Sequence, residues 1–295
     1  MNYMVSPVWR ALILENLNAS RMIQEGLQRL CCVYVEEIIG LRPVGWVSPL
    51  YLGLLDFTAG LERLAKITIS ISGLLHGDSF TPVRRYGHKI SKLLDAVEAI
   101  QLPAGFSSEL FARPTISQEA KLLELIDRFS VGAGRYENID SLTVPDRTPE
   151  LYDAWCEIAR NEPVPKFVED LIILRKVIAE QTLDAATSGD FPIDLETIIL
   201  NWIDLEDAHP VFAPSSAVAV QLSILTRWVA DAQERINFVL FRAKPSTTVK
   251  IPYLYEATVN LRLSPEPFFE HVVMEYSSAD ALLDAIGNEN SESSE

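Results

Sequence analysis

The sequence predicts an all-α protein with a large apolar core. Apolar residues recur at spacings of three and four through most of the 295-residue chain, as they do along the buried face of a helix. Ser6-Pro7 and Ser48-Pro49 supply the capping serine and the first-turn proline that typically begin helices. Hydrophobic residues make up 48% of the chain and the mean hydropathy is +0.13, which is typical of a globular protein.

Four helices are predicted before a proline-containing linker, and together they form an N-terminal bundle. Their expected ranges are 6–39, 48–75, 86–100 and 117–129. Gly40 follows the first helix, and Pro82 and Gly87 interrupt the chain between the second and the third. The linker, residues 141–149, holds two prolines. We therefore end the first domain, residues 1–146, inside this linker.

The C-terminal half is also predicted to be mainly helical. Helices are expected at 149–161, 164–186, 194–205 and 214–243, within a second helical region at 147–245. Alternating apolar and polar residues at 249–263 favour one or two strands, in a small mixed or extended segment at 246–285. The last residues, 286–295, are acidic and are expected to be disordered.

The charge and the cysteines exclude several classes of protein. The formal net charge is −16, which disfavours a general electrostatic attraction to nucleic acid or to an anionic membrane. No apolar run is long enough to span a bilayer, and the first residues do not have the basic and apolar regions expected of a signal peptide. Cys31, Cys32 and Cys156 lack the spacing of a zinc site, so free, buried thiols in a reducing compartment are expected. We expect a cytoplasmic protein with no metal and no cofactor.

Glu62 and Lys66 lie four residues apart on the second predicted helix. A glutamate that precedes a lysine by four residues stabilises a helix by only about 0.2–0.5 kcal/mol. The pair usually lies on a solvated face, and that interpretation comes first. Here Leu61, Leu64 and Ala65 surround it, so it forms a narrow polar strip on a mostly apolar helix. A role in a ligand site is the alternative.

The clearest local reversal of charge lies between the second and the third helix. No acidic residue occurs between Ser79 and Leu94. The basic residues there, with one histidine, are Arg84, Arg85, His88, Lys89 and Lys92. They fall at or near a predicted helix N-terminus, where free backbone amides favour anions. A phosphate or carboxylate site is predicted at Arg84, Arg85, His88 and Lys89, and a solvated basic face that pairs with acidic parts of the chain is the alternative.

Two motifs resemble the HEPN superfamily of helical-bundle domains. GLERLAK, residues 60–66, is followed after about twenty residues by YGHKISKLL, residues 86–94. This order is similar to the family's Glu…Lys helix followed by a helix that begins near a histidine. GRYENID, residues 134–140, is similar to an Arg-Tyr…Asn-x-Asp element in some of the same bacterial proteins. The resemblance covers about residues 10–145.

The resemblance implies a bundle of four or five helices that is often dimeric. It also implies a place in bacterial phage-defence or toxin–antitoxin systems, where many members are metal-independent ribonucleases. In those members four to six residues lie between the arginine and the histidine, whereas three residues lie between Arg84 and His88 and two between Arg85 and His88. Lys89 also stands where an aspartate is common. Both departures argue against ribonuclease activity.

Further polar residues complete the predicted site or are set aside. Arg135, Tyr136 and Asp140 follow a glycine-rich helix stop, and Arg135 is expected to pair with Glu62 across the bundle; a shared polar site is the alternative. The Gly-Asp-Ser at residues 77–79 follows a helix rather than a strand, so it does not predict a lipase-type nucleophile. The acidic residues around His209 are interpreted as a solvated helix end rather than a metal site.

Three functions remain open from the sequence. The first is a non-catalytic HEPN-like homodimer that binds a nucleotide, an RNA end or a protein partner beside Arg85 and His88. The second is an active ribonuclease that uses His88 with Arg84 or Arg85. The third is an oligomerisation protein without a ligand. The unusual spacing places the first above the second, and the basic segment places it above the third.

Overall fold

A computed structural model describes most of the chain and confirms the all-α class. The described residues are 6–33, 35, 48–77, 79–106, 111–132, 150–170, 173, 195–243 and 251–266, with the backbone alone described at 48, 150, 195–212 and 243. Their α-helices are α1 Pro7–Cys31, α2 Ser48–Ser72, α3 Ile90–Glu98, α4 Glu119–Ser130, α6 Glu150–Arg160, α8 Leu195–Ala243 and α9 Tyr255–Thr258. Short 3₁₀ turns are η2 Gly73–Leu75, η3 Arg84–Tyr86 and η5 Val259–Arg262. These ranges contain no strand.

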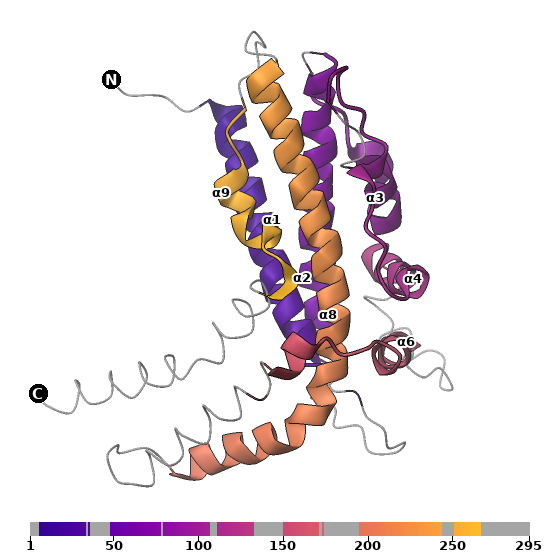
Figure 1. Ribbon diagram of the computed structural model, residues 1–295, viewed down its shortest axis with the longest axis vertical. Helices are drawn as coiled ribbons and strands as arrows, with labels where there is room; N and C mark the ends of the chain where they lie inside the picture. The colour runs from indigo at the N-terminus through magenta and orange to yellow at the C-terminus, as the bar shows by residue number, and fades with distance from the viewer. Residues whose placement is uncertain are drawn as a thin grey trace, which may run out of the picture.

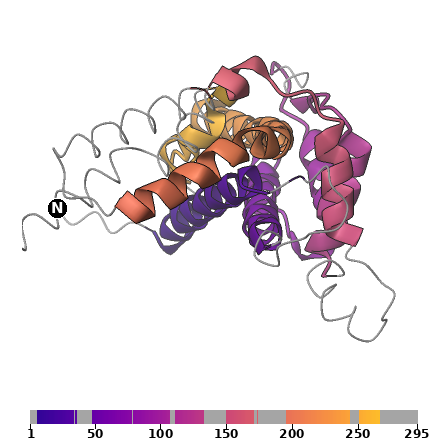
Figure 2. The same ribbon diagram turned by 90° about the horizontal axis from the view of Figure 1, so that it is seen from below.

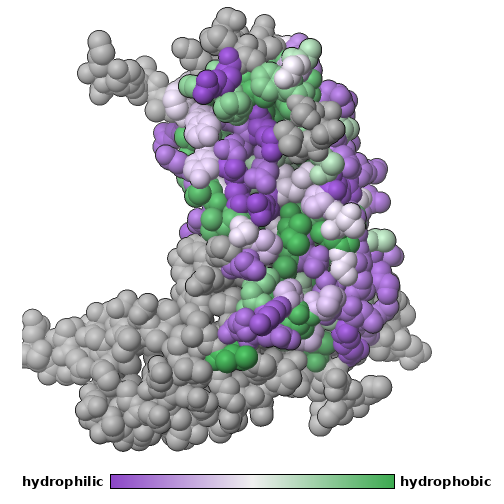
Figure 3. Space-filling model, in the orientation of Figure 1, coloured by the Kyte–Doolittle hydropathy of each residue, from purple (hydrophilic) through white to green (hydrophobic). Residues whose placement is uncertain are grey.

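Three long helices, α1, α2 and the upright part of α8, run side by side and form the centre of the molecule (Figures 1 and 2). The helices α3 and α4 pack against α2, whereas α9 packs against α1. Buried apolar residues of α1, α2, α3, α4 and α8 form one core, which Leu254 and Leu261 join from either side of α9. On the face in Figure 3, hydrophilic residues surround scattered hydrophobic groups, as expected when most apolar side chains face inward.

The start of α1 follows the capping rule from which it was predicted. The Ser6 hydroxyl accepts a hydrogen bond from the Trp9 amide at 3.1 Å, and Pro7 occupies the first turn. The helix ends earlier than the predicted residue 39, at Cys31. Residues 34 and 36–47 lie outside the described part of the chain.

Glycines bring α1 and α2 close together. A β-carbon on Gly26 would lie 2.4 Å from the Phe57 nitrogen, which is backbone and cannot move aside easily. On α2, a β-carbon on Gly60 would lie 2.8 Å from Ile23 and 2.9 Å from the Ala19 carbonyl oxygen. The two backbones therefore approach at a distance that only glycine permits.

The predicted break between residues 205 and 214 is wrong, because α8 is one helix of 49 residues. Its sequence contains Pro210 and Pro214, each of which removes an amide from the helical ladder. Figure 1 shows that α8 bends between its first part and its upright part, which is how proline is accommodated inside a long helix.

The expected domain boundary after residue 146 lies outside the described residues. Beyond it, α8 shares one apolar core with α1 and α2. Ser215 of α8 donates a hydrogen bond to the Val33 carbonyl at 2.7 Å and accepts one from the Trp155 indole at 3.0 Å. The C-terminal half thus supplies a central helix to the bundle.

The strands predicted within 249–263 are wrong for the described residues, because Tyr255–Arg262 is helical. Leu254, Ala257, Thr258 and Leu261 are all buried. These positions follow the helical spacing of three and four, which the alternating pattern concealed. The segment lies on the bundle, where Ser20 donates a hydrogen bond to the Ala257 carbonyl at 2.5 Å. Among the described residues no helix is both long and apolar enough to cross a membrane.

We predict that Gly26→Ala lowers the free energy of unfolding by about 1–3 kcal/mol, because the added methyl group overpacks the α1–α2 contact. In a helix with free space around the glycine, the same substitution stabilises by about 1 kcal/mol. The sign of the change in the free energy of unfolding therefore shows whether the helices are in close contact. Gly77→Ala is the control, because its β-carbon would meet no atom closer than 3.8 Å. Urea denaturation measures both variants. A stabilised Gly26→Ala variant would mean that the helices are not this close.

Candidate functional site

The basic segment between α2 and α3 is held against the end of α2. The Thr81 amide donates a hydrogen bond to the Ser70 carbonyl at 2.9 Å. Gly73 lies directly beneath, where a β-carbon would be 2.6 Å from the Thr81 nitrogen. The chain then makes the η3 turn and reverses at Gly87, whose φ of +64° favours glycine. Because of this reversal, α3 begins at Ile90, four residues after the start predicted at residue 86. His88 therefore lies in a turn and not in the helix.

The structure brings His88, Glu62 and Lys66 together, although 26 residues separate His88 from Glu62. The Lys66 ammonium donates to Glu62 Oε1 at 2.6 Å, and His88 Nδ1 lies 3.0 and 3.1 Å from the two Glu62 oxygens. The Glu62 side chain is only 14% exposed, whereas that of His88 is 67% exposed. Glu62 therefore fixes the imidazole through Nδ1. In a neutral imidazole that donates from Nδ1, the other ring nitrogen, Nε2, is an acceptor.

The N-terminus of α3 is already occupied by a carboxylate of the same chain. Asp127 on α4 accepts hydrogen bonds from the Ser91 amide at 2.8 Å and from the Ser91 hydroxyl at 2.6 Å. Lys89 Nζ lies 3.6 Å from the same carboxylate, which is almost buried. The expectation that this helix offers free amides to an external anion is therefore wrong for Ser91. Asp127 acts as the cap that the sequence around Lys89 does not supply.

The arginines of the segment are exposed and one of them is held in place. Arg84, Arg85 and Lys92 all have exposed side chains. The Arg85 guanidinium donates to the Tyr86 hydroxyl at 2.9 Å and lies 5.0 Å from the centre of the Tyr86 ring. The aromatic ring thus orients one cation at the surface without neutralising it.

Part of the predicted site falls outside the described residues. Arg135, Tyr136 and Asp140 lie there, so the expected Arg135–Glu62 pair stays a prediction. The side chains of Asp204, Asp207 and His209 on α8 are likewise not described. None of the three cysteines forms a disulfide bond within the described residues. Cys31 and Cys156 are buried, as expected, whereas the expectation that Cys32 is buried is wrong, because it is exposed.

Asp127 and Ser91 are the residues that sequence reasoning missed. One signal was present, because Asp127 lies beside Leu125, Ile126 and Phe129 on the apolar face of α4. An aspartate on a buried face needs hydrogen-bond donors. Its partner could not be identified from the sequence, since Ser91 is 36 residues away.

Comparison with known proteins finds no matching family model, no matching curated protein and no matching solved structure. The resemblance to HEPN domains therefore stays a prediction.

We predict that Asp127→Ala lowers the free energy of unfolding by about 2 kcal/mol. The variant removes both hydrogen bonds to Ser91 and the negative charge at the start of α3. Glu124→Ala is the matched control, because Glu124 is an exposed acid on the same helix, and we expect a change within about 0.5 kcal/mol. Urea denaturation of both variants measures the difference. Equal effects would contradict the capping role of Asp127.

Proposed function

We propose that this protein binds the phosphate end of an RNA or a nucleotide through Arg84, Arg85 and Lys92, and that it does not cleave the bound molecule. The observation that supports this most strongly is the Arg85 guanidinium, which Tyr86 holds at the surface within a segment free of acidic residues. Guanidinium groups bind phosphate oxygens in a bidentate manner, and their charge-assisted hydrogen bonds are stronger than neutral ones.

The arrangement of Arg85 supports phosphate binding over a merely solvated basic face. A flexible arginine loses rotational freedom when it binds, which costs about 0.5–1.5 kcal/mol for a long side chain. The contact with Tyr86 reduces that cost before a ligand arrives. An aromatic ring beside a cation also suits a nucleotide, because a base can stack next to its phosphate.

The charge of the whole chain favours a short ligand. With a net charge of −16, a long RNA would be repelled wherever it extends beyond the basic segment. A terminal phosphate or a mononucleotide places its charge on the segment alone. The resemblance to HEPN proteins suggests a defence or toxin system as the context, with a homodimer or a protein partner; both remain proposals.

The test is fluorescence anisotropy with a short labelled single-stranded RNA that carries either a 5′-phosphate or a 5′-hydroxyl. We expect the 5′-phosphate to bind at least tenfold more tightly, because it offers additional charge-assisted contacts. Three cations predict a slope of about −2 for the logarithm of affinity against the logarithm of salt concentration on single strands.

The Arg84→Gln/Arg85→Gln double variant should abolish the preference for the phosphate. Lys121→Gln serves as the control, because this lysine pairs with Glu157 on another part of the surface. If the double variant binds both RNAs like the unmodified protein, the proposed surface is not the site.

An active ribonuclease is the second candidate, because Glu62 orients His88 as a carboxylate orients a catalytic base. Among the described residues, the hydrogen bonds of the His88 ring go to Glu62, and none joins the ring to an arginine. Cleavage by a 2′-hydroxyl needs both a base and a cation at one phosphate.

The proposal predicts that the purified protein and its His88→Ala variant degrade single-stranded RNA at the same background rate. A general base contributes about 10²–10⁴-fold to a rate, so the difference is easily measured on a gel. Glu62→Gln, which keeps the size of the side chain, is the companion variant. A hundredfold loss of cleavage in His88→Ala would instead support the ribonuclease and remove the non-catalytic proposal.

A further inference from the structure

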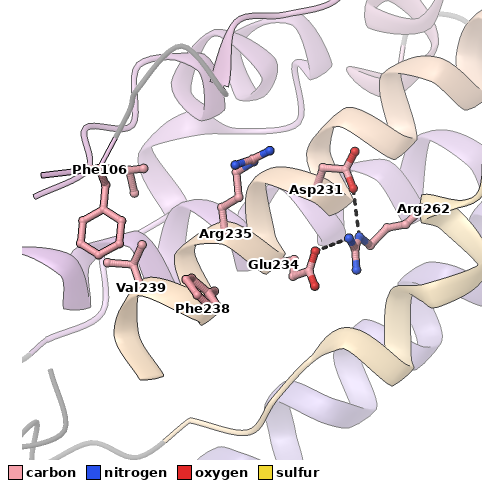
Figure 4. Close-up of a pocket in the computed structure, with 8 residues that line it drawn as sticks. Phe106, Asp231, Glu234, Arg235, Phe238, Val239 and Arg262 are labelled. Carbon is pink, nitrogen blue, oxygen red and sulfur yellow. Dashed lines mark hydrogen bonds and ion pairs between the residues drawn. The ribbon is translucent and has the colours of Figure 1, made fainter. Parts of the chain in front are cut away.

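A pocket lies on α8, far in sequence from the basic segment. It is a cavity of about 380 Å³ between α8, the loop after α3 and η5. That volume is within the range of about 300–1,000 Å³ that is common for small-molecule sites. Figure 4 shows its two sides, one apolar and one charged, with Arg235 between them.

The apolar side offers an aromatic surface that the protein leaves incompletely covered. Phe106 from the loop and Phe238 and Val239 from α8 form this side. The Phe238 side chain is 47% exposed, although a phenylalanine stabilises a protein most when it is buried. The Arg242 guanidinium lies 5.5 Å from the centre of the Phe238 ring and covers it in part.

The two acids of the charged side are already paired within the protein. Arg262 of η5 donates to Asp231 at 2.9 Å and pairs with Glu234, and Tyr253 donates to Glu234 at 3.3 Å. These contacts occupy both acids, so neither is available for a cationic ligand. The contacts also hold η5 against α8.

Arg235 supplies the remaining charge. It lines the pocket and forms no ion pair with any residue in the described part of the chain. Arg242 lies against the Phe238 ring and is not one of the residues that line the pocket, so Arg235 is the lining cation that can meet an acidic group. This arrangement matches a ligand with one acidic group and an aromatic or apolar body. A ligand with several charges is disfavoured, because Asp231 and Glu234 lie on the opposite side.

We propose that this pocket binds a small organic anion, with its acidic group on Arg235 and its aromatic or apolar body against Phe106 and Phe238. The site is separate from the basic segment, and it stands whether or not the protein binds RNA. The charge of the pocket defines the class of ligand as a monocarboxylate or a sulfonate on an aromatic or apolar body.

The test uses 8-anilinonaphthalene-1-sulfonate, an aromatic anion whose fluorescence rises when it binds, and N-phenyl-1-naphthylamine, which has the same rings and no charge. We expect the anion to bind saturably, with one molecule per chain and at least tenfold more tightly than the neutral compound. Arg235→Gln should remove that tenfold difference, and Arg235→Lys should restore part of it. Phe238→Ala should weaken both compounds.

Lys121→Gln, which removes a distant positive charge, should change neither affinity. Circular dichroism checks that each variant keeps its helices, since partly unfolded proteins also bind this dye. Non-saturable binding, or equal affinities of the anion for Arg235→Gln and for the unmodified protein, would overturn the proposal.

Discussion

The close contact of α1 with α2 is the constraint on which the rest of the structure depends. Gly26 and Gly60 let the two backbones meet at distances that exclude a β-carbon. The paired helices then offer apolar faces on which α8, α3 and α4 pack. Because α2 is fixed from several sides, Glu62 has a defined position. The turn that carries His88 is fixed through the loop held at Ser70 and Gly73.

At the N-terminus of α3, the Ser91 amide is not available to an external anion. Asp127 satisfies the Ser91 amide from inside the bundle, so the protein supplies its own anion at this position. What remains for an external ligand is a set of side chains, Arg84, Arg85 and Lys92, around a histidine already bonded to Glu62. Anion binding by the basic segment therefore depends on the charges of these exposed side chains. Substitutions can remove those charges without unfolding the helix.

The sequence predicts local features well and misses features that depend on distant contacts. The start of α1 at Ser6-Pro7 and that of α2 at Ser48 depend on neighbouring residues alone, and both are confirmed. The break expected near Pro214 is wrong, because packing along the bundle outweighs the loss of an amide in a helix of this length.

In the candidate site, too, the features set by neighbouring residues were predicted and those set by distant contacts were not. The charge reversal placed Arg84, Arg85 and His88 in one segment, since they are close in sequence, and the polar strip on α2 identified Glu62. Their contact across 26 residues and the capping of Ser91 by Asp127 required the tertiary fold. The helical spacing of Leu254, Ala257 and Leu261 was present in the sequence but was hidden by an equally good alternation.

The most direct test of this account is a titration of the ¹⁵N-labelled protein with adenosine 5′-monophosphate, followed by two-dimensional NMR. The account predicts that the side-chain Nε–H signals of Arg84 and Arg85 move most, because the phosphate binds to these guanidinium groups. The Ser91 amide should move much less, since Asp127 already accepts its hydrogen bond. A titration in which the Ser91 amide moves most, or in which neither arginine responds, would contradict the account.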